Sequence, residues 1–554
     1  MCSEIVSFPT KPEKRLKIGC SLPFRLLTEP SDTDSTGLCA AFGSREALLS
    51  EIARFADTVE LRSVGAGCAP ETVLSAAELL KNAGLGCTVH ASLADISPET
   101  FFAPYTLLFS SGLQGSYCLT VHPLPDTDDT VRVLRALCRC AEERGYPVTL
   151  ALENQRFSAP EKRKTGSCRA VSAIAAAVDS PVLATCFDFG HQHSNFRKFG
   201  ADADVVDDDF LSRAGHTHIH ALYEGTTHFP LTMGETALEE NLTGLLRNGY
   251  SGILSLELEA QRFAGIAEFR SAYLDSLRML RTAEGCVRRK LDAQAWYRDS
   301  YPAAVRAGLA ELDKKQSAVL PLAPALYFLS VGGKRIAVDP ALWSLPLSEE
   351  GIDVLLEALG TADAVILTHG HIDHCDPAFM KRLRDRIPRF YVPDFLADTL
   401  TADGTLRPET VISVQAGERL DYDGVTLTFF ESPHVGVPEY GFSVQYDGKT
   451  LLFPTDIRSY EQAVEELPHF EHPILFAHVW LVRVQSMNPA RYEEQLAPYR
   501  AFLASTGAER ILFGHLYDVR RTASDMWTDQ HTDAIINGTD VPAELLLPGT
   551  VYEL

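Results

Sequence analysis

The sequence predicts an α/β protein in two parts, a (β/α)8 barrel followed by an α/β sandwich of mixed sheets. In the first half, apolar runs alternate with segments whose apolar residues recur at three- and four-residue intervals, as parallel strands and their crossover helices do. In the second half, strand-like runs are separated by short turns, and helical segments are fewer. The length of 554 residues suits two to four domains, since a domain usually has about 100–200 residues.

Eight apolar runs in the first half predict strands. They are Leu16–Phe24, Thr58–Val64, Gly86–Leu93, Tyr117–Pro123, Val148–Asn154, Val182–His191, Thr217–Leu222 and Gly252–Glu259. Predicted helices between them include Ser44–Phe55, Ala69–Ala83, Asp129–Arg144, Arg169–Val178, Ala237–Arg247 and Ile266–Arg281. Eight strands with intervening helices indicate a TIM barrel. An open doubly wound sheet is less favoured, because no glycine-rich phosphate loop follows the first strand.

A basic helical stretch, Val287–Lys315, separates the halves and is read as a linker or a bridging helix pair. After it, the predicted strands are Ala325–Phe328, Arg335–Val338, Ala364–Leu367, Phe390–Val392, Thr410–Val414, Val425–Phe430, Gly441–Tyr446, Thr450–Pro454, Ile474–Ala477 and Arg510–Phe513. Turns such as Gly332-Gly333 and Asp447-Gly448 are typical of hairpins. We therefore expect a barrel over residues 1–285, a helical linker over 286–319 and a sandwich over 320–554.

Composition limits the classes of partner. Hydrophobic residues make up 45% and charged residues 22%, which excludes a disordered or fibrous chain. With 74 acidic and 50 basic side chains, the net charge of −24 repels phosphate backbones and anionic membranes. The N-terminus does not resemble a secretory signal, and the 12 cysteines contain no CxxC pair. We expect a cytoplasmic protein with free thiols that acts on a small molecule. We expect neither nucleic acid nor a membrane as partner, and the sequence leaves open whether the protein forms a homo-oligomer.

The most specific motif is THGHIDH, residues Thr368–His374, which follows the predicted strand Ala364–Leu367. Two histidines at positions i and i+2 of extended chain point to the same side and can share one cation. Asp373 and His374 can then supply ligands to a second cation. Imidazole and carboxylate groups suit zinc, iron or manganese. A surface loop with incidental histidines is the alternative, and three histidines and an aspartate in six positions argue against it.

The spacing His369-x-His371-x-Asp373-His374 resembles the signature of the metallo-β-lactamase superfamily, whose fold is an αββα sandwich. Other residues of that signature follow the same order in this chain: Asp339, His434, Asp456 and His515. The resemblance implies two Zn²⁺ ions, or Mn²⁺ or Fe²⁺. It also implies the ligands: His369, His371 and His434 for one ion, Asp373, His374 and His515 for the other, and Asp456 as a bridge. His478 is either a residue of the pocket or a structural histidine.

Two metals in such a site activate a water molecule and stabilise a developing oxyanion. The implied reaction is hydrolysis of an ester, lactone, amide or phosphodiester, with Asp373 and Asp456 as catalytic residues. The superfamily is wide, so the fold does not select the bond.

The predicted barrel strands carry a second group of ligand-type residues. The active sites of TIM barrels lie at the carboxyl ends of the strands. Residues of this kind lie at or near these ends on six successive strands: His90; His122; Glu153; Asp188 and His191; His218 and His220; Glu257 and Glu259. A single one would indicate a salt bridge or a helix cap. Six successive strands indicate a metal site.

This arrangement resembles the xylose isomerase-like barrels, which include sugar phosphate isomerases and epimerases, ketose 3-epimerases, inosose-processing enzymes and endonuclease IV-like repair enzymes. The resemblance implies that Glu153, Asp188, His220 and Glu257 bind one Mn²⁺, Co²⁺ or Mg²⁺, with His191 facing the substrate. His90, His122, Glu60, Arg62 and Asn154 could line the pocket. Many members have an aspartate three residues after the equivalent of His220, and this chain has none. The later segment His228–Leu231 does resemble the family's His-Leu-Pro-Leu.

The implied barrel chemistry is proton abstraction beside a carbonyl, with Glu153 and Glu257 as base and acid on opposite sides of a sugar-like substrate. Epimerisation, isomerisation and dehydration all fit. We therefore expect a two-site metalloenzyme whose sandwich hydrolyses an ester, lactone or phosphoester and whose barrel isomerises, epimerises or cleaves a carbohydrate-derived substrate. The alternatives are a nuclease and a hydrolase whose inactive barrel serves for binding.

Overall fold

The chain divides into two compact units, residues 13–288 and residues 289–554. The computed structural model describes residues 15–65, 67–94, 96–113, 117–158, 163–262, 266–343, 345–479, 489–528, 536 and 539–554. The predicted limits at residues 285 and 319 stay predictions, and residues 1–14 of the predicted barrel lie outside the described residues.

The first unit is a closed barrel of eight parallel strands in the order β1-β10-β7-β6-β5-β4-β3-β2. The strands are β1 (Lys17–Pro23), β2 (Thr58–Arg62), β3 (Gly86–His90), β4 (Tyr117–Val121), β5 (Val148–Glu153), β6 (Leu183–Asp188), β7 (Ala214–Ile219) and β10 (Ile253–Leu256). Each overlaps one of the eight predicted strands. Closure between β1 and β10 confirms the predicted TIM barrel and rules out the open sheet.

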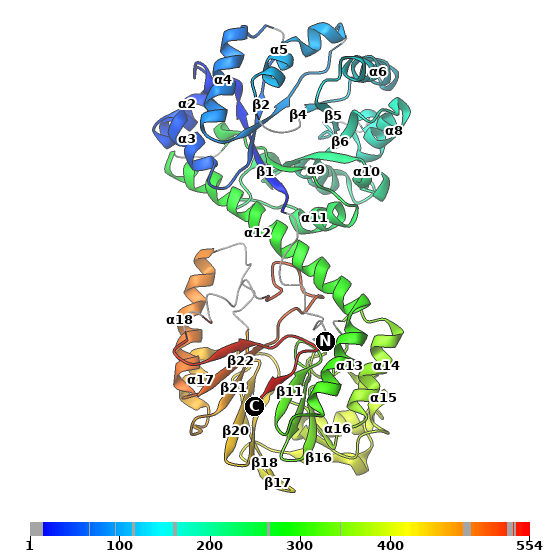
Figure 1. Ribbon diagram of the computed structural model, residues 1–554, viewed down its shortest axis with the longest axis vertical. Coiled ribbons are helices and arrows are strands. Elements are labelled where there is room, and N and C mark those ends of the chain that lie inside the picture. Colours follow the sequence, from blue (N-terminus) through cyan, green and yellow to red (C-terminus); the bar gives the residue numbers. More distant parts are fainter. Residues whose placement is uncertain are drawn as a thin grey trace. The chain divides into compact units, whose positions relative to one another are not determined.

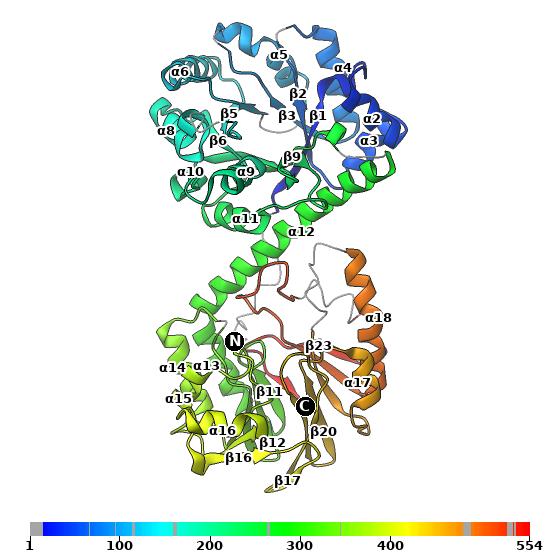
Figure 2. The ribbon, with the colours of Figure 1, turned by 180° about the vertical axis from the view of Figure 1, so that it is seen from behind.

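Helices surround the barrel strands in both views of the molecule (Figures 1 and 2). They are α1 (Phe24–Leu27), α2 (Thr33–Phe42), α3 (Arg45–Ile52), α4 (Pro70–Asn82), α5 (Pro98–Ser110), α6 (Thr127–Arg144), α7 (Arg163–Gly166), α8 (Cys168–Val178), α9 (Phe189–Phe199), α10 (Asp208–Ser212) and α11 (Leu238–Arg247), with a short hairpin of β8 (Ala221–Tyr223) and β9 (Thr226–Phe229) and a 3-10 turn, η2 (Ala260–Arg262). The predicted helices do not include the longer helices α2, α5 and α9 or the short helices α1, α7 and α10.

The predicted strand Val182–His191 is wrong at its end, because β6 stops at Asp188 and α9 begins there. The physical reason is a helix cap. Asp188 has extended backbone angles, and its Oδ1 accepts a hydrogen bond from the backbone N–H of His191 at 2.6 Å. A side-chain oxygen at this position satisfies an amide that the first turn leaves without a partner. His191 is therefore a helical residue directly after the strand end.

The second unit contains two seven-stranded sheets. The first consists of β11 (Ala318–Pro321), β12 (Tyr327–Val331), β13 (Lys334–Val338), β14 (Ala364–Ile366), β15 (Phe390–Pro393), β16 (Val411–Val414) and β24 (Tyr552–Glu553). The second consists of β17 (Arg419–Tyr422), β18 (Val425–Glu431), β19 (Tyr440–Tyr446), β20 (Lys449–Thr455), β21 (Ile474–His478), β22 (Arg510–Gly514) and β23 (Ala543–Leu545). The predicted hairpin turns link β12 to β13 and β19 to β20, as expected.

The two sheets pack face to face with helices outside, which confirms the αββα sandwich. Between them, Phe453 stacks on Phe476 with ring centroids 4.0 Å apart, and Tyr327 of the other sheet joins the same cluster. In Figure 1 the helices α13 to α16 cover one flank and α17 and α18 the other. These helices are α13 (Tyr301–Leu312), α14 (Glu349–Leu359), α15 (Pro377–Leu383), α16 (Asp394–Ala402), α17 (Tyr460–Glu466) and α18 (Pro489–Ser505), with a 3-10 turn, η3 (Pro408–Thr410).

The basic stretch between the halves forms helix, as predicted. Helix α12 runs over Ile266–Asp299, and α13 follows directly. Buried residues of α13 belong to the core cluster that contains Leu320 and Leu322, and the hydroxyl of Tyr301 donates to the carbonyl of Leu322 at 2.8 Å. Helix α13 is therefore part of the sandwich core. In the part of the chain that the structure describes, no helix is long and apolar enough to cross a bilayer.

Candidate metal centres

The predicted sandwich ligands lie where strands end. The THGHIDH segment follows β14, His434 follows β18, Asp456 follows β20 and His515 follows β22. Each strand is paired on both sides within its sheet, which limits the positions of the first residues beyond it. The fold thus gathers ligands that lie up to 146 residues apart in the chain (369 to 515).

His369, His371 and His434 form one group, in which one ring nitrogen from each lies within 4.8 Å of the others. His369 Nε2 is 3.1 Å from His371 Nδ1. Burial and the nearby His374 lower the pKa of His369 well below its usual value. Burial and Arg458 lower the pKa of His434 to about 4. Both imidazoles are therefore neutral at pH 7, as a metal ligand must be.

His374, Asp456, His478 and His515 form a second group, again with one ligand atom each within 4.8 Å. Asp373 lies beside it, with Oδ2 3.6 Å from His515 Nε2. Burial would raise the pKa of Asp456, but His515 and His374 outweigh burial and hold it well below its usual value. The contacts of Asp456 with histidine are to this second group, so its bridging role stays a prediction.

Asp339 orients one of these ligands. Its Oδ2 lies 2.8 Å from His374 Nδ1, and its carboxylate also accepts hydrogen bonds from the backbone N–H and hydroxyl of Thr368 at 2.9 and 2.7 Å. A carboxylate bound to one imidazole nitrogen directs the other nitrogen at the metal. The remaining nitrogen, His374 Nε2, is buried and has no hydrogen-bond partner among the described residues. The donor set therefore fits a cation.

His478 and Glu439 also belong to this centre. His478 Nδ1 lies 2.7 Å from Asp456 Oδ1, which places this histidine behind a predicted ligand. Glu439 was missed by the sequence analysis. Its Oε1 accepts a hydrogen bond from the backbone N–H of Asp456 at 2.7 Å, and its Oε2 lies 3.7 Å from His434 Nε2. Burial and Asp456 raise the pKa of Glu439 well above its usual value. No spacing in the sequence marks Glu439, because it reaches the site through the pairing of its backbone with His369.

A cavity of about 680 Å³ opens beside the first histidine group. Its walls are Trp343, His371, Ile372, Asp373, His434, Val435, Arg458, Asp518, Arg520 and Arg521. A substrate in this cavity would touch the predicted ligands of both ions.

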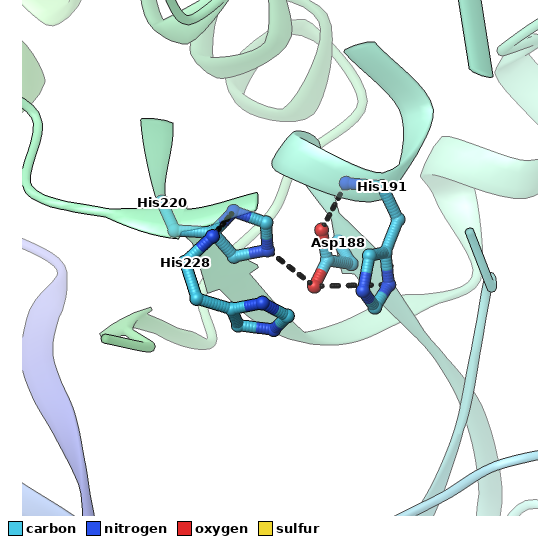
Figure 3. Close-up of side chains that lie close together, drawn as sticks. All are labelled: Asp188, His191, His220 and His228. Atoms are coloured by element: carbon cyan, nitrogen blue, oxygen red, sulfur yellow. Dashed lines mark hydrogen bonds and ion pairs between the residues drawn. The ribbon is translucent and has the colours of Figure 1, made fainter. Parts of the chain in front are cut away.

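In the barrel, Glu153 ends β5, Asp188 ends β6, His220 follows β7 and Glu257 follows β10. Asp188 Oδ2 lies 3.2 Å from both His220 Nε2 and His191 Nδ1, and Figure 3 shows the two rings pointing at this carboxylate. His191 Nδ1 is also 3.3 Å from Glu153 Oε1. Three of the four predicted ligands therefore lie close together: His191 contacts Glu153 and Asp188, and Asp188 contacts His220.

His218 joins the fourth ligand to this set. Its Nδ1 lies 3.2 Å from both Glu153 Oε2 and Glu257 Oε2, and its Nε2 lies 2.8 Å from Glu60 Oε1. All four side chains are buried. Burial would raise the pKa of Glu153 and of Glu257, but His218 leads the neighbouring imidazoles that hold both well below their usual value. Glu60 therefore lies beneath the site, where it anchors His218.

The other predicted pocket residues divide into two kinds. His90, His122 and Arg62 line a cavity of about 510 Å³ together with Glu153, His191, His228 and Glu257. Asn154 is buried and does not line it. Its side chain donates to the carbonyl of Asp188 at 3.0 Å and accepts from the N–H of Asp188 at 2.7 Å, so it fastens β5 to β6.

Where an aspartate would accept a hydrogen bond from His220 Nδ1, this chain has a backbone donor. The N–H of His228 donates to His220 Nδ1 at 3.0 Å, and the His228 ring stacks on the His220 ring with centroids 4.1 Å apart (Figure 3). An N–H donor at Nδ1 leaves the proton of the neutral ring on Nε2, so a cation at Nε2 must displace that proton. The buried carboxylate oxygens Glu153 Oε1 and Glu257 Oε2, which have no hydrogen-bond partner among the described residues, fit a divalent cation without this cost.

Comparison with known proteins identifies both folds. Residues 53–283 match the family described as xylose isomerase-like TIM barrel, and residues 334–515 match the beta-lactamase superfamily domain. The chain therefore joins a xylose isomerase-like barrel to a metallo-β-lactamase fold.

Two curated relatives are described as metal-dependent hydrolases. One, from Saccharolobus solfataricus, is 28% identical over 142 residues, which cover 24% of this chain and 61% of the relative. The other, from Sulfurisphaera tokodaii, is 26% identical over 135 residues, which cover 23% of this chain and 58% of the relative. Among solved structures, a D-psicose 3-epimerase from Clostridium cellulolyticum is 12% identical, with a TM-score of 0.36, over 49% of this chain and 100% of that chain.

Replacing Gly190 by alanine should disturb the barrel site. A Cβ at this position would lie 1.9 Å from His220 Cε1, so the imidazole must move away from Asp188. We expect the G190A variant to bind Mn²⁺ at least tenfold more weakly, a loss typical when a ligand loses its orientation. Metal titration is carried out in a background with H371A and D456A, which removes one predicted ligand from each sandwich group, and the ions that the sandwich of this background still binds are subtracted. G37A is the matched control, because Gly37 is also helical and a Cβ there meets no atom within 4 Å. Equal Mn²⁺ affinity in the two variants would contradict the site.

Replacing His478 by alanine should weaken zinc binding by about 10–100-fold, because Asp456 loses the imidazole that orients it. The measurement is competition with a zinc chelator. H469A serves as the control, since His469 is an exposed histidine of the same unit. An H478A protein that holds zinc as tightly as H469A would show that His478 does not support Asp456.

Proposed function

We propose that this chain is a two-site metalloenzyme. The sandwich hydrolyses an ester, lactone or phosphoester with a dinuclear centre, and the barrel isomerises, epimerises or cleaves a carbohydrate-derived small molecule with one divalent cation. The observation that carries the proposal is the clustering of six of the predicted sandwich ligands in two groups, with ligand atoms within 4.8 Å of one another in each group. Three predicted ligands, His371, Asp373 and His434, line a cavity of about 680 Å³.

For the sandwich, His369, His371 and His434 would hold one ion, and Asp373, His374 and His515 the other, with Asp456 between them. Two bound divalent ions would activate water and offset the charge that develops on the substrate oxygen. The side chain of Asp373 would act as the proton acceptor. Burial would raise the pKa of Asp373, but His515 and His374 hold it below its usual value. Asp373 lines the cavity and can take up a proton from the attacking water at Oδ2.

For the barrel, Glu153, Asp188, His220 and Glu257 would hold Mn²⁺, Co²⁺ or Mg²⁺, which polarises a carbonyl when bound. Glu153 and Glu257 each place a carboxylate oxygen 3.2 Å from His218 Nδ1, and both line the cavity. Since both carboxylates are ionised, one of them can remove the proton beside the carbonyl and then return that same proton to a carbon of the substrate. Burial opposes the charge on His191, but Asp188 and Glu153 raise its pKa to about 9, so it can donate a hydrogen bond to a substrate oxygen.

A barrel with more than one cation is the second candidate, favoured by one observation. His90, His122 and Glu153 form a further group with ligand atoms within 4.8 Å of one another. A phosphodiesterase could use several ions in this way. The net charge of −24 still disfavours nucleic acid as its substrate. Metal stoichiometry of the H371A/D456A background decides between one barrel ion and several.

A cytoplasmic location fits the cysteines. The eleven described cysteines, among them Cys138 and Cys140, are free, as they are in a reducing compartment.

The double variant E153Q/D188N should remove the barrel cation. Both changes keep the shape of the side chain and remove a carboxylate charge, so metal content should fall by one ion per chain while the thermal unfolding temperature changes little. Ketose and inosose substrates test isomerisation, and this activity should vanish. Wild-type barrel metal content in the variant would refute the ligand assignment. A wild-type barrel with no activity on any sugar would instead support the binding-only alternative.

In the double variant H371A/D456A, the rate of hydrolysis should fall by about 10³-fold or more, because the two changes remove one predicted ligand from each group. The barrel reaction should stay within twofold, since every predicted ligand of the barrel lies before residue 288 and every sandwich ligand after residue 289. Assays of both reactions on the same preparation provide the measurement. Equal loss of both activities in a folded protein would contradict two separate sites.

A further inference from the structure

The cavity beside the sandwich centre is rich in arginine. Arg458, Arg520 and Arg521 line it, whereas its acidic residues are Asp373 and Asp518. The wall thus brings three guanidinium groups together, against two lining carboxylates, in a chain whose net charge is −24. Divalent ions at the neighbouring histidines would add further positive charge.

Each arginine is held in a defined place. Arg458 Nη2 lies 3.7 Å from Asp456 Oδ2, and its Nε donates to His434 Nε2 at 3.4 Å. Arg521 Nε lies 3.0 Å from Asp518 Oδ2, and its Nη2 lies 3.6 Å from Asp373 Oδ2. These side chains are only 18% and 19% exposed, so they cannot move freely into solvent.

Arg520 is fixed by an aromatic ring instead. Its guanidinium carbon lies 4.2 Å from the centroid of the Trp343 ring, and its Nη1 donates to the Trp343 carbonyl. A guanidinium stacked on a ring keeps its edge available for hydrogen bonds. Trp343 is 43% exposed, and Val435 on the same cavity is 72% exposed. The cavity thus offers apolar surface next to fixed cations.

We infer that this cavity is a binding subsite for an anionic group, a phosphate or a carboxylate, carried by the substrate of the sandwich centre beside an apolar portion. The guanidinium fork matches the oxygen pairs of both groups. A cavity of about 680 Å³ suits a ligand of small-molecule size. The inference rests on the proposed hydrolase function, because it describes the substrate of that same site.

A binding experiment tests the subsite without relying on catalysis. Methylphosphonate and acetate are titrated calorimetrically into the zinc-loaded full-length chain. The R520A/R521A variant should bind the preferred probe about tenfold to a hundredfold more weakly, the loss expected for charge-assisted hydrogen bonds. R306A is the matched control, because Arg306 is an exposed arginine of the same unit paired with Glu350, and it should stay within twofold. Tighter binding of methylphosphonate identifies phosphate as the group, and tighter binding of acetate identifies carboxylate.

R520A alone covers the case in which the double variant loses zinc or fails to fold, since it leaves Arg521 and its contact with Asp373 in place. It should weaken the preferred probe at least threefold. If R520A and the zinc-loaded R520A/R521A variant both bind the probe with wild-type affinity, the inference is overturned. If the double variant does not fold, wild-type affinity in R520A overturns it.

Measurements of ester hydrolysis provide a second test of the subsite. For 4-nitrophenyl butyrate and mono-4-nitrophenyl succinate, which differ in a carboxylate, R520A should raise KM for the anionic ester alone. Equal effects on both esters count against the subsite. If the wild-type chain hydrolyses no ester, lactone or phosphodiester, the proposed function fails, and the calorimetric result still judges the subsite.

Discussion

Both units depend on burying ionised carboxylates next to imidazoles. A buried carboxylate without a partner is costly, and either takes up a proton or destabilises the fold. Glu153 and Glu257 share His218, and Asp456 lies among His374, His478 and His515. These imidazoles outweigh the effect of burial on the pKa of each carboxylate. The histidines that surround each candidate centre therefore keep these carboxylates ionised.

The two folds meet this constraint in different ways. The closed barrel directs side chains of different strands into one interior, where residues from β2, β5, β7 and the end of β10 meet. The deep pair of Glu60 and His218 anchors the site from below. The sandwich has no such interior and places its ligands in loops at the strand ends. Here backbone pairing gives the support, as where Glu439 pairs with His369 and accepts the N–H of Asp456.

The sequence was sufficient for the fold, and most residues that it predicts for each candidate centre lie close together in the structure. Alternating strand and helix patterns identified every barrel strand, and the dense THGHIDH motif predicted a metal centre among residues that the structure brings close together. The prediction from sequence was wrong or incomplete where a residue has both a role in local secondary structure and a tertiary contact. Asp188 both ends a strand and caps a helix, so its apolar surroundings extended the predicted strand too far. Glu439 and the support of His220 by the backbone of His228 depend on tertiary contacts that no spacing records.

The two oxygens of Asp188 have separate partners. Oδ1 accepts the amide of His191 and so holds the first turn of α9, while Oδ2 faces the imidazoles of the site. A change at Oδ2 that rotates the carboxylate also loosens the cap, which is worth about 1 kcal/mol in typical helices. If a cation binds at Oδ2, as proposed, its occupancy would be coupled to fraying of this helix end. The exchange of the His191 amide proton with solvent would report on that occupancy from within the protein, without a substrate or a probe.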